Sequence, residues 1–122
     1  MKDCIFCKII NNDIPSYKVY EDDLVLSFMT IDPVSNGHIL LIPKSHHENV
    51  LDMPDDLIVH MHNVIKNKLY NMLKERLNCD GITLSQNNEY GQEIKHYHIH
   101  LIPKYKEKQN LLKVEEVWNK LK

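Results

Sequence analysis

The sequence predicts an α+β fold in which one long helix packs across a mainly antiparallel, five-stranded sheet and short helices lie near both termini. Two patterns predict this class. Residues 96–103 alternate between histidine and apolar or aromatic side chains, which is the period of two of a β-strand. Residues 57–77 repeat apolar side chains at steps of three and four, as an amphipathic helix does. A length of 122 residues predicts one domain over 1–122, with 106–122 as its C-terminal tail.

The N-terminal part of the chain is predicted to form a short helix and two strands. Apolar residues within 4–12 fit one or two helical turns, which the polar run 11–13 and then Pro15 end. Residues 17–21 and 24–29 read as two strands joined by a polar turn. In the second strand, alternate side chains should face opposite ways, with Leu24, Leu26 and Phe28 on one face and Val25, Ser27 and Met29 on the other.

A third strand and the long helix follow. Residues 32–37 are rich in turn-forming residues, and 38–44 read as a strand. The serine and glutamate of 45–48 have the spacing of a capping box, which predicts a short helix there. Pro54 fits the first position of the long helix, which we expect to end near 77–78.

The C-terminal third completes the predicted sheet. Residues 81–86 read as the fourth strand, and 87–91 as a turn before the fifth strand at 96–103. A polar linker at 106–110 then leads to a C-terminal helix at 112–121, whose apolar residues are spaced for packing on one side.

Composition and charge narrow the functional classes. Because the net charge is −2 and the basic residues are mixed with acids, we expect no nucleic-acid partner. No apolar run approaches 18 residues, so we expect no membrane partner, and the N-terminus does not have the pattern of a signal peptide. Three cysteines are an odd number, which indicates free thiols in a reducing compartment and hence a cytoplasmic location.

The three alternating histidines are the first candidate functional group. On a strand, His96, His98 and His100 would share one face, with neighbouring side chains about 6.6 Å apart. Neutral imidazole can act as a nucleophile, a general base or a metal ligand. The spacing therefore leaves covalent catalysis and a three-histidine metal centre open. The metal reading has a geometric weakness, because alternate side chains of one strand converge poorly on a single tetrahedral ion.

The Cys-x-x-Cys pair at Cys4 and Cys7 is a second candidate group. The pair fits a redox dithiol, half of a metal site, or two thiols without a role. A redox site would be expected in a βαβ context, which the surrounding sequence does not predict. His46 follows a predicted strand, and two thiolates with two imidazoles form a common structural zinc site, so we favour zinc.

Several separated blocks resemble one known family. Residues 91–102 match the histidine triad motif, in which three alternating histidines follow a Gly-Gln pair. Up to about Tyr105 the chain resembles the histidine triad (HIT) family, and in particular its Hint-like nucleotide-binding branch. Further matching blocks are 3–10, 14–16, 19–22, Pro33, 37–38, 42–44 and His46. The resemblance implies a HIT-like fold and a homodimer whose interface includes the long helix and a strand.

The resemblance also implies an enzyme, a HIT-type nucleotidyl hydrolase or phosphoramidase. It would act as a hydrolase or transferase at the α-phosphate of a purine nucleoside phosphoramidate or a dinucleotide, through a covalent nucleotidyl intermediate on His98. The other nitrogen of that ring would donate to a backbone carbonyl, which leaves the attacking nitrogen unprotonated. The alternative is a non-catalytic, nucleotide-binding regulatory module, which would bind a purine mononucleotide tightly without turnover.

Further roles follow from the same resemblance. His38 and His100 would donate hydrogen bonds to the phosphate, and Gln92 would lie at the leaving-group side. Some family members bind a structural zinc, and the matching ligands here are Cys4, Cys7, His46 and His96; no organic cofactor is implied. The implied catalytic residues are His96, His98, His100 and Gln92, and the implied nucleotide-binding residues are His38, Thr30, Ile31, Asn87, Gly91 and Glu93.

The chain departs from the family pattern at two of these positions. Thr30 stands where an aspartate commonly binds the ribose hydroxyls, and a hydroxyl lacks the charge-assisted acceptors of a carboxylate. Glu93 stands where a serine or threonine often lies near the phosphate. An inward carboxylate would repel an anionic substrate, so we expect Glu93 to point outward or to act on a neighbour. The loop that contains Asn87 is also about two residues shorter than is usual in the family.

Overall fold

The computed structural model describes residues 3–122 and contains one five-stranded antiparallel sheet in the order β1–β2–β3–β5–β4. The predicted fold class is confirmed. The strands, all close to their predicted positions, are β1 (Lys18–Glu21), β2 (Val25–Met29), β3 (Ile39–Pro43), β4 (Gly81–Ser85) and β5 (Ile99–Lys104).

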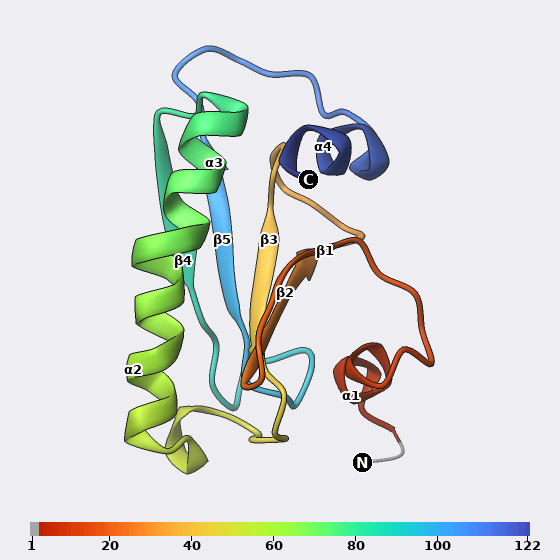
Figure 1. Ribbon diagram of the computed structural model, residues 1–122, viewed down its shortest axis with the longest axis vertical. Coiled ribbons are helices and arrows are strands. Elements are labelled where there is room, and N and C mark those ends of the chain that lie inside the picture. Colours follow the sequence, from red (N-terminus) through yellow and green to blue (C-terminus); the bar gives the residue numbers. More distant parts are fainter. Residues whose placement is uncertain (1–2) are drawn as a thin grey trace.

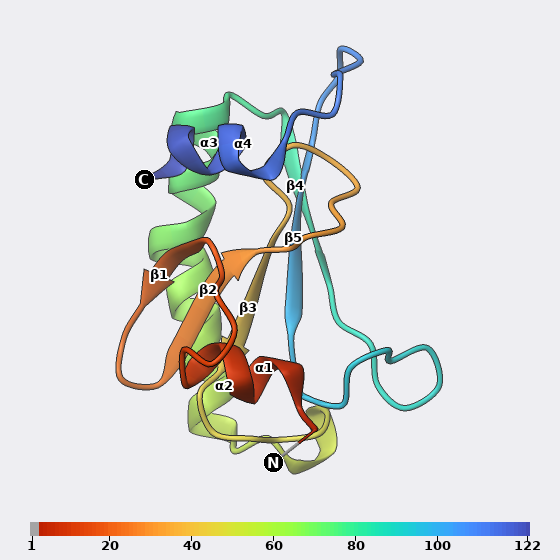
Figure 2. The same cartoon turned by 90° about the vertical axis from the view of Figure 1, so that its right-hand side faces the viewer.

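Helices cover both faces of this sheet (Figures 1 and 2). The predicted long helix runs without a break through α2 (Asp55–Val64), a π-helical segment (Ile65–Leu69) and α3 (Tyr70–Leu77). α1 (Ile5–Ile10) lies on the opposite face, and α4 (Val114–Leu121) packs beside α3 at one end of the sheet. Within residues 3–122, no helix combines the length and the apolar character that crossing a membrane requires.

The sheet separates two apolar cores, because alternate side chains of its central strands face opposite sides. The larger core lies under the long helix, and the smaller one lies under α1. The predicted division of β2 is confirmed, although Leu24 at the preceding turn is 51% exposed. In the last strand region, Tyr97, Ile99 and Leu101 all join the larger core. The alternating histidines therefore face the α1 side.

The segment that contains these histidines is only partly a regular strand. The β3–β5 pairing ends at Leu41 and Ile99, so His96 and His98 precede the ladder and only His100 lies within it. If the register continued, Pro43 of β3 would lie opposite Tyr97, and proline has no N–H to donate. The backbone N–H of Tyr97 donates instead to the carbonyl of His47, at 2.7 Å.

The prediction of a helix at 45–48 is wrong. That segment has no helical structure, because it lies beside the residues that precede β5. A capping box does form four residues later, where Asn49 caps a short 3-10 helix (Val50–Asp52) and Asp52 accepts from the N–H of Asn49. Pro54 is the N-cap of α2 rather than its first residue.

A partly exposed cluster of hydrogen bonds around Asp22 links the β1–β2 turn to α2. The carboxylate of Asp22 bonds His60 Nε2 at 2.8 Å and accepts from the Tyr20 hydroxyl at 2.9 Å. It also accepts from the N–H groups of Leu24 and Val25, which holds the turn closed. Burial tends to raise the pKa of Asp22, but these hydrogen bonds outweigh that effect and hold the pKa at about 2.

We expect Asp22→Asn to remove an acid-sensitive part of the folding free energy. A carboxylate with a depressed pKa stabilises the folded state above its unfolded pKa, and this contribution is lost as the pH falls from about 4 to about 2. The variant should be less stable at pH 7 by about 1 kcal/mol, and the difference from wild type should shrink progressively as the pH falls toward 2. Urea unfolding across this range measures it. Asp23→Asn, an exposed neighbour, is the matched control, and an equal loss in both variants would contradict the role of Asp22.

Candidate active site and metal cluster

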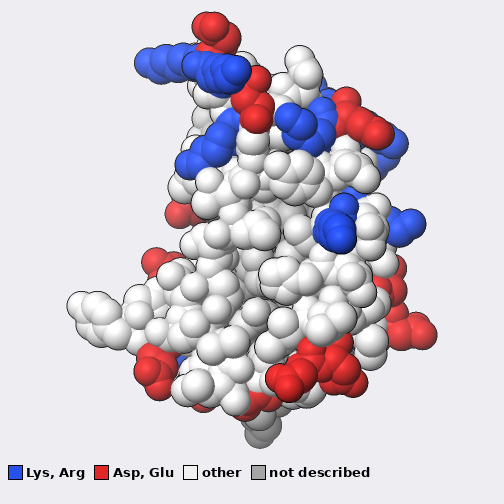
Figure 3. All heavy atoms as spheres, turned by 90° about the vertical axis from the view of Figure 1, so that its left-hand side faces the viewer, with Lys and Arg blue, Asp and Glu red and all other residues white. Residues whose placement is uncertain are grey.

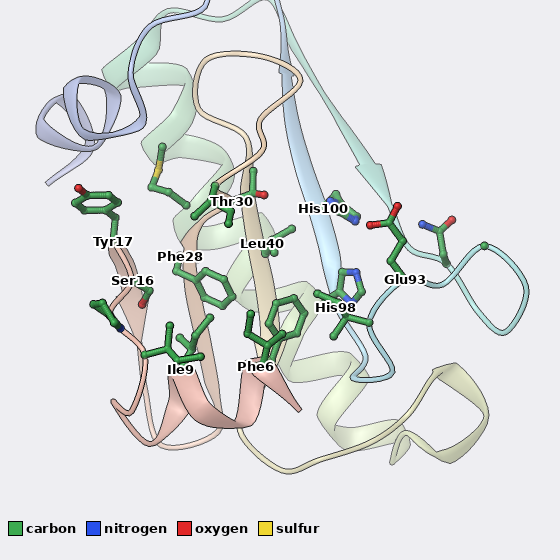
Figure 4. Close-up of a pocket in the computed structure, with 18 residues that line it drawn as sticks. Phe6, Ile9, Ser16, Tyr17, Phe28, Thr30, Leu40, Glu93, His98 and His100 are labelled. Atoms are coloured by element: carbon green, nitrogen blue, oxygen red, sulfur yellow. The ribbon is translucent and has the colours of Figure 1, made fainter. Parts of the chain in front are cut away.

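A cavity of about 600 Å³ opens on the α1 side of the sheet (Figure 4). One part of its wall is apolar, and Phe6 and Ile9 of α1 meet Phe28 of β2 and Leu40 of β3 there. Seven of the residues predicted for the site line this cavity, namely His98, His100, Thr30, Ile31, Asn87, Gly91 and Glu93. The other predicted residues, His38, Gln92, His96, Cys4, Cys7 and His46, lie outside its lining.

His98 is held as a neutral imidazole with one free nitrogen. Its Nδ1 lies 2.7 Å from the backbone carbonyl of His96, which accepts a hydrogen bond and so places the ring proton on Nδ1. Nε2 is then left with an unshared electron pair. Burial lowers the pKa of His98, although the bond to His96 and the carboxylate of Glu93 oppose this. Phe6 packs edge-on against the ring, with the centroids 5.2 Å apart.

A relay of hydrogen bonds fixes the second imidazole of the cavity. The N–H of Val34 donates to His38 Nδ1 at 3.1 Å, so the proton of His38 is on Nε2. That Nε2 donates to His100 Nδ1 at 2.9 Å, which leaves the proton of His100 on its own Nε2. Burial and the neighbouring His100 ring lower the pKa of His38 to about 4, so it stays neutral. His38 therefore orients His100, and His100 presents an N–H donor.

Gln92 is buried and fully engaged away from the cavity. Its side-chain Nε2 donates to the carbonyl of Glu48, and its Oε1 accepts from the N–H of Glu89 at 3.1 Å. The side chain thus ties the loop before β5 to the segment after β3. The structure does not bring Gln92 together with His98 and His100, and its role at the leaving group stays a prediction.

The four residues predicted as zinc ligands lie together beside the cavity. The candidate ligand atoms of Cys4, Cys7, His46 and His96 are all within 4.8 Å of one another. Sγ of Cys4 is 3.3 Å from His96 Nδ1, and Sγ of Cys7 is 3.3 Å from His46 Nδ1. Zinc bonds of about 2.3 Å to sulfur and 2.0 Å to nitrogen give tetrahedral edges of about 3.5 Å, so the cluster fits such an ion.

Two properties of the ligands support a cation at this position. His96 Nε2 donates to the carbonyl of Pro43 at 2.8 Å, which leaves Nδ1 unprotonated and directed at the cysteines. Burial and the neighbouring Cys4 raise the pKa of Cys7 to about 11, so a thiolate there needs a positive partner. The cluster could therefore hold a metal. Of the three alternating histidines, only His96 belongs to this cluster. The cluster is therefore not the three-histidine metal centre that the spacing left open.

The sequence analysis missed the apolar wall of the cavity. Phe6 and Phe28 contact one another edge-to-face, with centroids 5.5 Å apart, and Ser16 and Tyr17 line the same cavity. The sequence indicates that Leu26 and Phe28 share one apolar face of a strand. It does not indicate that α1 packs on this face, because α1 precedes β2 in the chain and its position depends on the fold.

Comparisons with known proteins agree with the motif. The family model described as HIT domain matches residues 11–107. An uncharacterized HIT-like protein of Borreliella burgdorferi is 50% identical over 87% of this chain and 78% of its own length. The adenosine 5'-monophosphoramidase HNT1 of Saccharomyces cerevisiae is 39% identical over 89% of this chain and 67% of its own length. A Zn-bound histidine triad family protein of Mycobacterium smegmatis superposes with a TM-score of 0.87 at 28% identity, over 98% of this chain and 91% of that structure.

Proposed function

The chain belongs to the HIT family, some of whose named members are nucleotide hydrolases, and on this basis we propose that it hydrolyses purine nucleoside phosphoramidates at the α-phosphate through a covalent intermediate on His98. The observation that supports this most directly is the bond from His98 Nδ1 to the His96 carbonyl. It exposes an unprotonated Nε2 in a cavity large enough for a nucleotide.

In the first step, Nε2 of His98 attacks phosphorus and the bond from phosphorus to the leaving nitrogen breaks. The ring then has a phosphoryl group on Nε2 and a proton on Nδ1, so it is positively charged. The carbonyl of His96 stabilises this imidazolium, because its oxygen accepts a hydrogen bond from the Nδ1–H group at 2.7 Å. The amine that leaves takes up a proton from solvent at the open mouth of the cavity.

In the second step, water attacks phosphorus and the bond to Nε2 breaks. A mononucleotide is released, the proton from water passes to solvent, and His98 returns to its neutral form. The N–H at His100 Nε2 donates to a phosphoryl oxygen as charge develops in both steps. His38 acts only through His100, since it does not line the cavity.

The nucleoside part of the substrate would occupy the apolar part of the cavity. Phe6, Ile9 and Phe28 offer flat and branched apolar surfaces that suit a purine ring. Thr30 and the 89%-exposed Ile31 lie at the rim, where the hydroxyl of Thr30 can bond the ribose. A hydroxyl supplies a weaker contact than a carboxylate there, so more of the affinity should come from the apolar wall.

We propose that the cluster of Cys4, Cys7, His46 and His96 binds a structural zinc ion. The supporting observations are the ligand distances, the unprotonated Nδ1 of His96 and the Zn-bound family member from Mycobacterium smegmatis. Bound zinc would supply the positive charge that stabilises both thiolates. All positions of an ion with four protein ligands are filled, so we assign it no part in the reaction.

We propose that the chain forms a homodimer through the β4 edge of the sheet. β4 is an outermost strand, and its Leu84 is 44% exposed. Figure 3 shows a broad area without charged side chains on the side of β4 and the long helix, with Lys, Arg, Asp and Glu around it. An unpaired edge strand next to an uncharged surface suits pairing with a second copy.

Sedimentation velocity at micromolar concentration tests this prediction. We expect a dimer for the wild type, and Leu84→Glu should raise the dissociation constant by at least about tenfold, since a charge would be buried without a partner. Leu111→Glu places the same charge on another exposed leucine and is the control. A wild-type protein that remains monomeric would refute the proposed interface.

Incubation with adenosine 5'-phosphoramidate tests the proposed reaction. We expect release of AMP and, after rapid acid-free quenching, a nucleotidyl group on the peptide that contains His98. Tight AMP binding without turnover of phosphoramidates or dinucleotides would favour the non-catalytic module instead. Turnover without labelling at His98 in quenched samples and in slow analogues would refute the covalent step.

A further inference from the structure

The cavity contains an acid in a place where a phosphate group is expected. Among the lining residues that the structure describes, Glu93 has the only carboxylate, and none is a lysine or an arginine. The remaining polar wall near it consists of Asn87 and the backbone at Gly91. The side that faces the reacting phosphorus is therefore negative rather than positive.

Figure 4 shows where this carboxylate lies. The Glu93 side chain extends from the loop before β5 toward the rings of His98 and His100, on the side opposite to Ile9 and Phe28. The same carboxylate favours the protonated forms of both imidazoles, which indicates that its field reaches them. The expectation was that Glu93 points outward or acts on a neighbour. Its side chain is exposed, and it borders the cavity beside these two rings.

Glu93 also borders a second, smaller hollow. Among the described residues that line it, Asp3 and Glu93 contribute carboxylates and Lys95 contributes an ammonium. Ile5, Glu93 and Ile94 line both hollows, which makes Glu93 part of the wall between them.

We propose that Glu93 is a specificity residue that selects substrates whose leaving group is a positively charged amine, so that the preferred substrates are nucleoside phosphoramidates of diamines or of basic amino-acid side chains. This proposal rests on the proposed function. The nucleoside occupies the apolar end, phosphorus lies at His98 and His100, and the leaving amine extends toward Glu93. A second ammonium on that amine pairs with the carboxylate, whereas a carboxylate or phosphate on it is repelled.

The same arrangement disfavours dinucleotide substrates. Their leaving group is itself a nucleotide or a polyphosphate with at least two negative charges. It would lie beside Glu93, and none of the described lining residues is a lysine or an arginine that could balance this charge. Of the two substrate types that the HIT motif suggests, the charge of this cavity favours phosphoramidates.

The test compares three adenosine 5'-phosphoramidates of equal length. Their leaving amines end in an ammonium, a hydroxyl or a carboxylate, and kcat/KM is measured for each. We expect the wild type to prefer the ammonium over the carboxylate substrate by at least about tenfold at low salt, since each full charge pair near 4 Å changes the rate by about fivefold even in water. Added salt should reduce this ratio. In Glu93→Gln the ratio should approach one.

Glu89→Gln is the matched control, because it removes the same charge from an exposed residue of the same loop that does not line the cavity. Its ratio should equal that of the wild type. An equal fall of the ratio in both variants would assign the effect to the net charge of the loop and overturn the proposal. A wild-type ratio near one would overturn it as well.

A binding measurement separates this proposal from the proposed reaction. The same three compounds are titrated against His98→Asn, with and without Glu93→Gln, and their dissociation constants are compared. If the wild type turns over none of them, the proposed reaction fails, and the ratio of dissociation constants still decides the role of Glu93. Equal dissociation constants, or no binding of any of the three, would refute the role of Glu93.

Discussion

His98→Asn should lower the kcat for AMP release from adenosine 5'-phosphoramidate by about 10⁴-fold or more, because no other unprotonated imidazole nitrogen faces the phosphorus. In the described residues, the other two histidines of the motif are engaged differently. His96 Nδ1 points to the cysteines, and His100 presents an N–H rather than an electron pair. Neither ring can replace the lost nucleophile.

The asparagine variant is chosen because it preserves the local structure. Its side-chain amide can donate to the carbonyl of His96 as the imidazole does, so we expect AMP affinity to change by less than about tenfold. His62→Asn makes the same change at an exposed position of α2 and should leave turnover unaltered. Turnover of the His98 variant near the wild-type level would exclude nucleophilic catalysis by this residue.

Most helices and strands could be predicted from local sequence patterns, because each pattern depends only on the residues of the element itself. The period of two in β2 and around His98 and the period near 3.6 in 57–77 directly define which side chains are buried. The helix predicted at 45–48 failed for the opposite reason. Its capping signal was local, but the segment is held extended by contacts with the residues before β5, which are 50 positions away.

The chemistry of the site could be predicted less completely. The motif indicates three imidazoles on one face, but each ring's proton position depends on a carbonyl or amide placed by the fold. The acceptors are the carbonyls of His96 and Pro43, and the donor to His38 is Val34. Such backbone partners have no residue type that a sequence could reveal. The same holds for Gln92, whose partners are the backbone groups of Glu48 and Glu89.

The position of His96 links the proposed zinc cluster to the proposed nucleophile, His98. One ring nitrogen faces the cysteines, the other bonds the Pro43 carbonyl, and the backbone carbonyl of the same residue fixes the tautomer of His98. A zinc ion held by this cluster would therefore stabilise the segment that orients His98. We expect loss of such an ion to lower the stability of the fold first, and the activity only as this segment becomes less ordered.

We expect His46→Asn to abolish tight zinc binding and to lower the free energy of unfolding by about 4 kcal/mol, the value for an ion present at about 1,000 times its dissociation constant. For a chain of this size, this corresponds to a fall in Tm of about 10–15 °C. The cluster joins α1 to the segments after β3 and before β5, so its loss frees three parts of the chain at once. Elemental analysis and calorimetry measure the two effects.

His47→Asn is the matched control, because its side chain is adjacent in sequence but outside the cluster, where it bonds Ser45. This variant should retain one zinc ion per chain and lose less than about 0.5 kcal/mol. A strong chelator should then lower the Tm of the wild type and of His47→Asn to near that of His46→Asn, while it leaves His46→Asn unchanged, and added zinc should restore the first two. A chelator that changes none of the three proteins, with no zinc found in the wild type, would show that the cysteines and histidines of this cluster stabilise the fold without a metal.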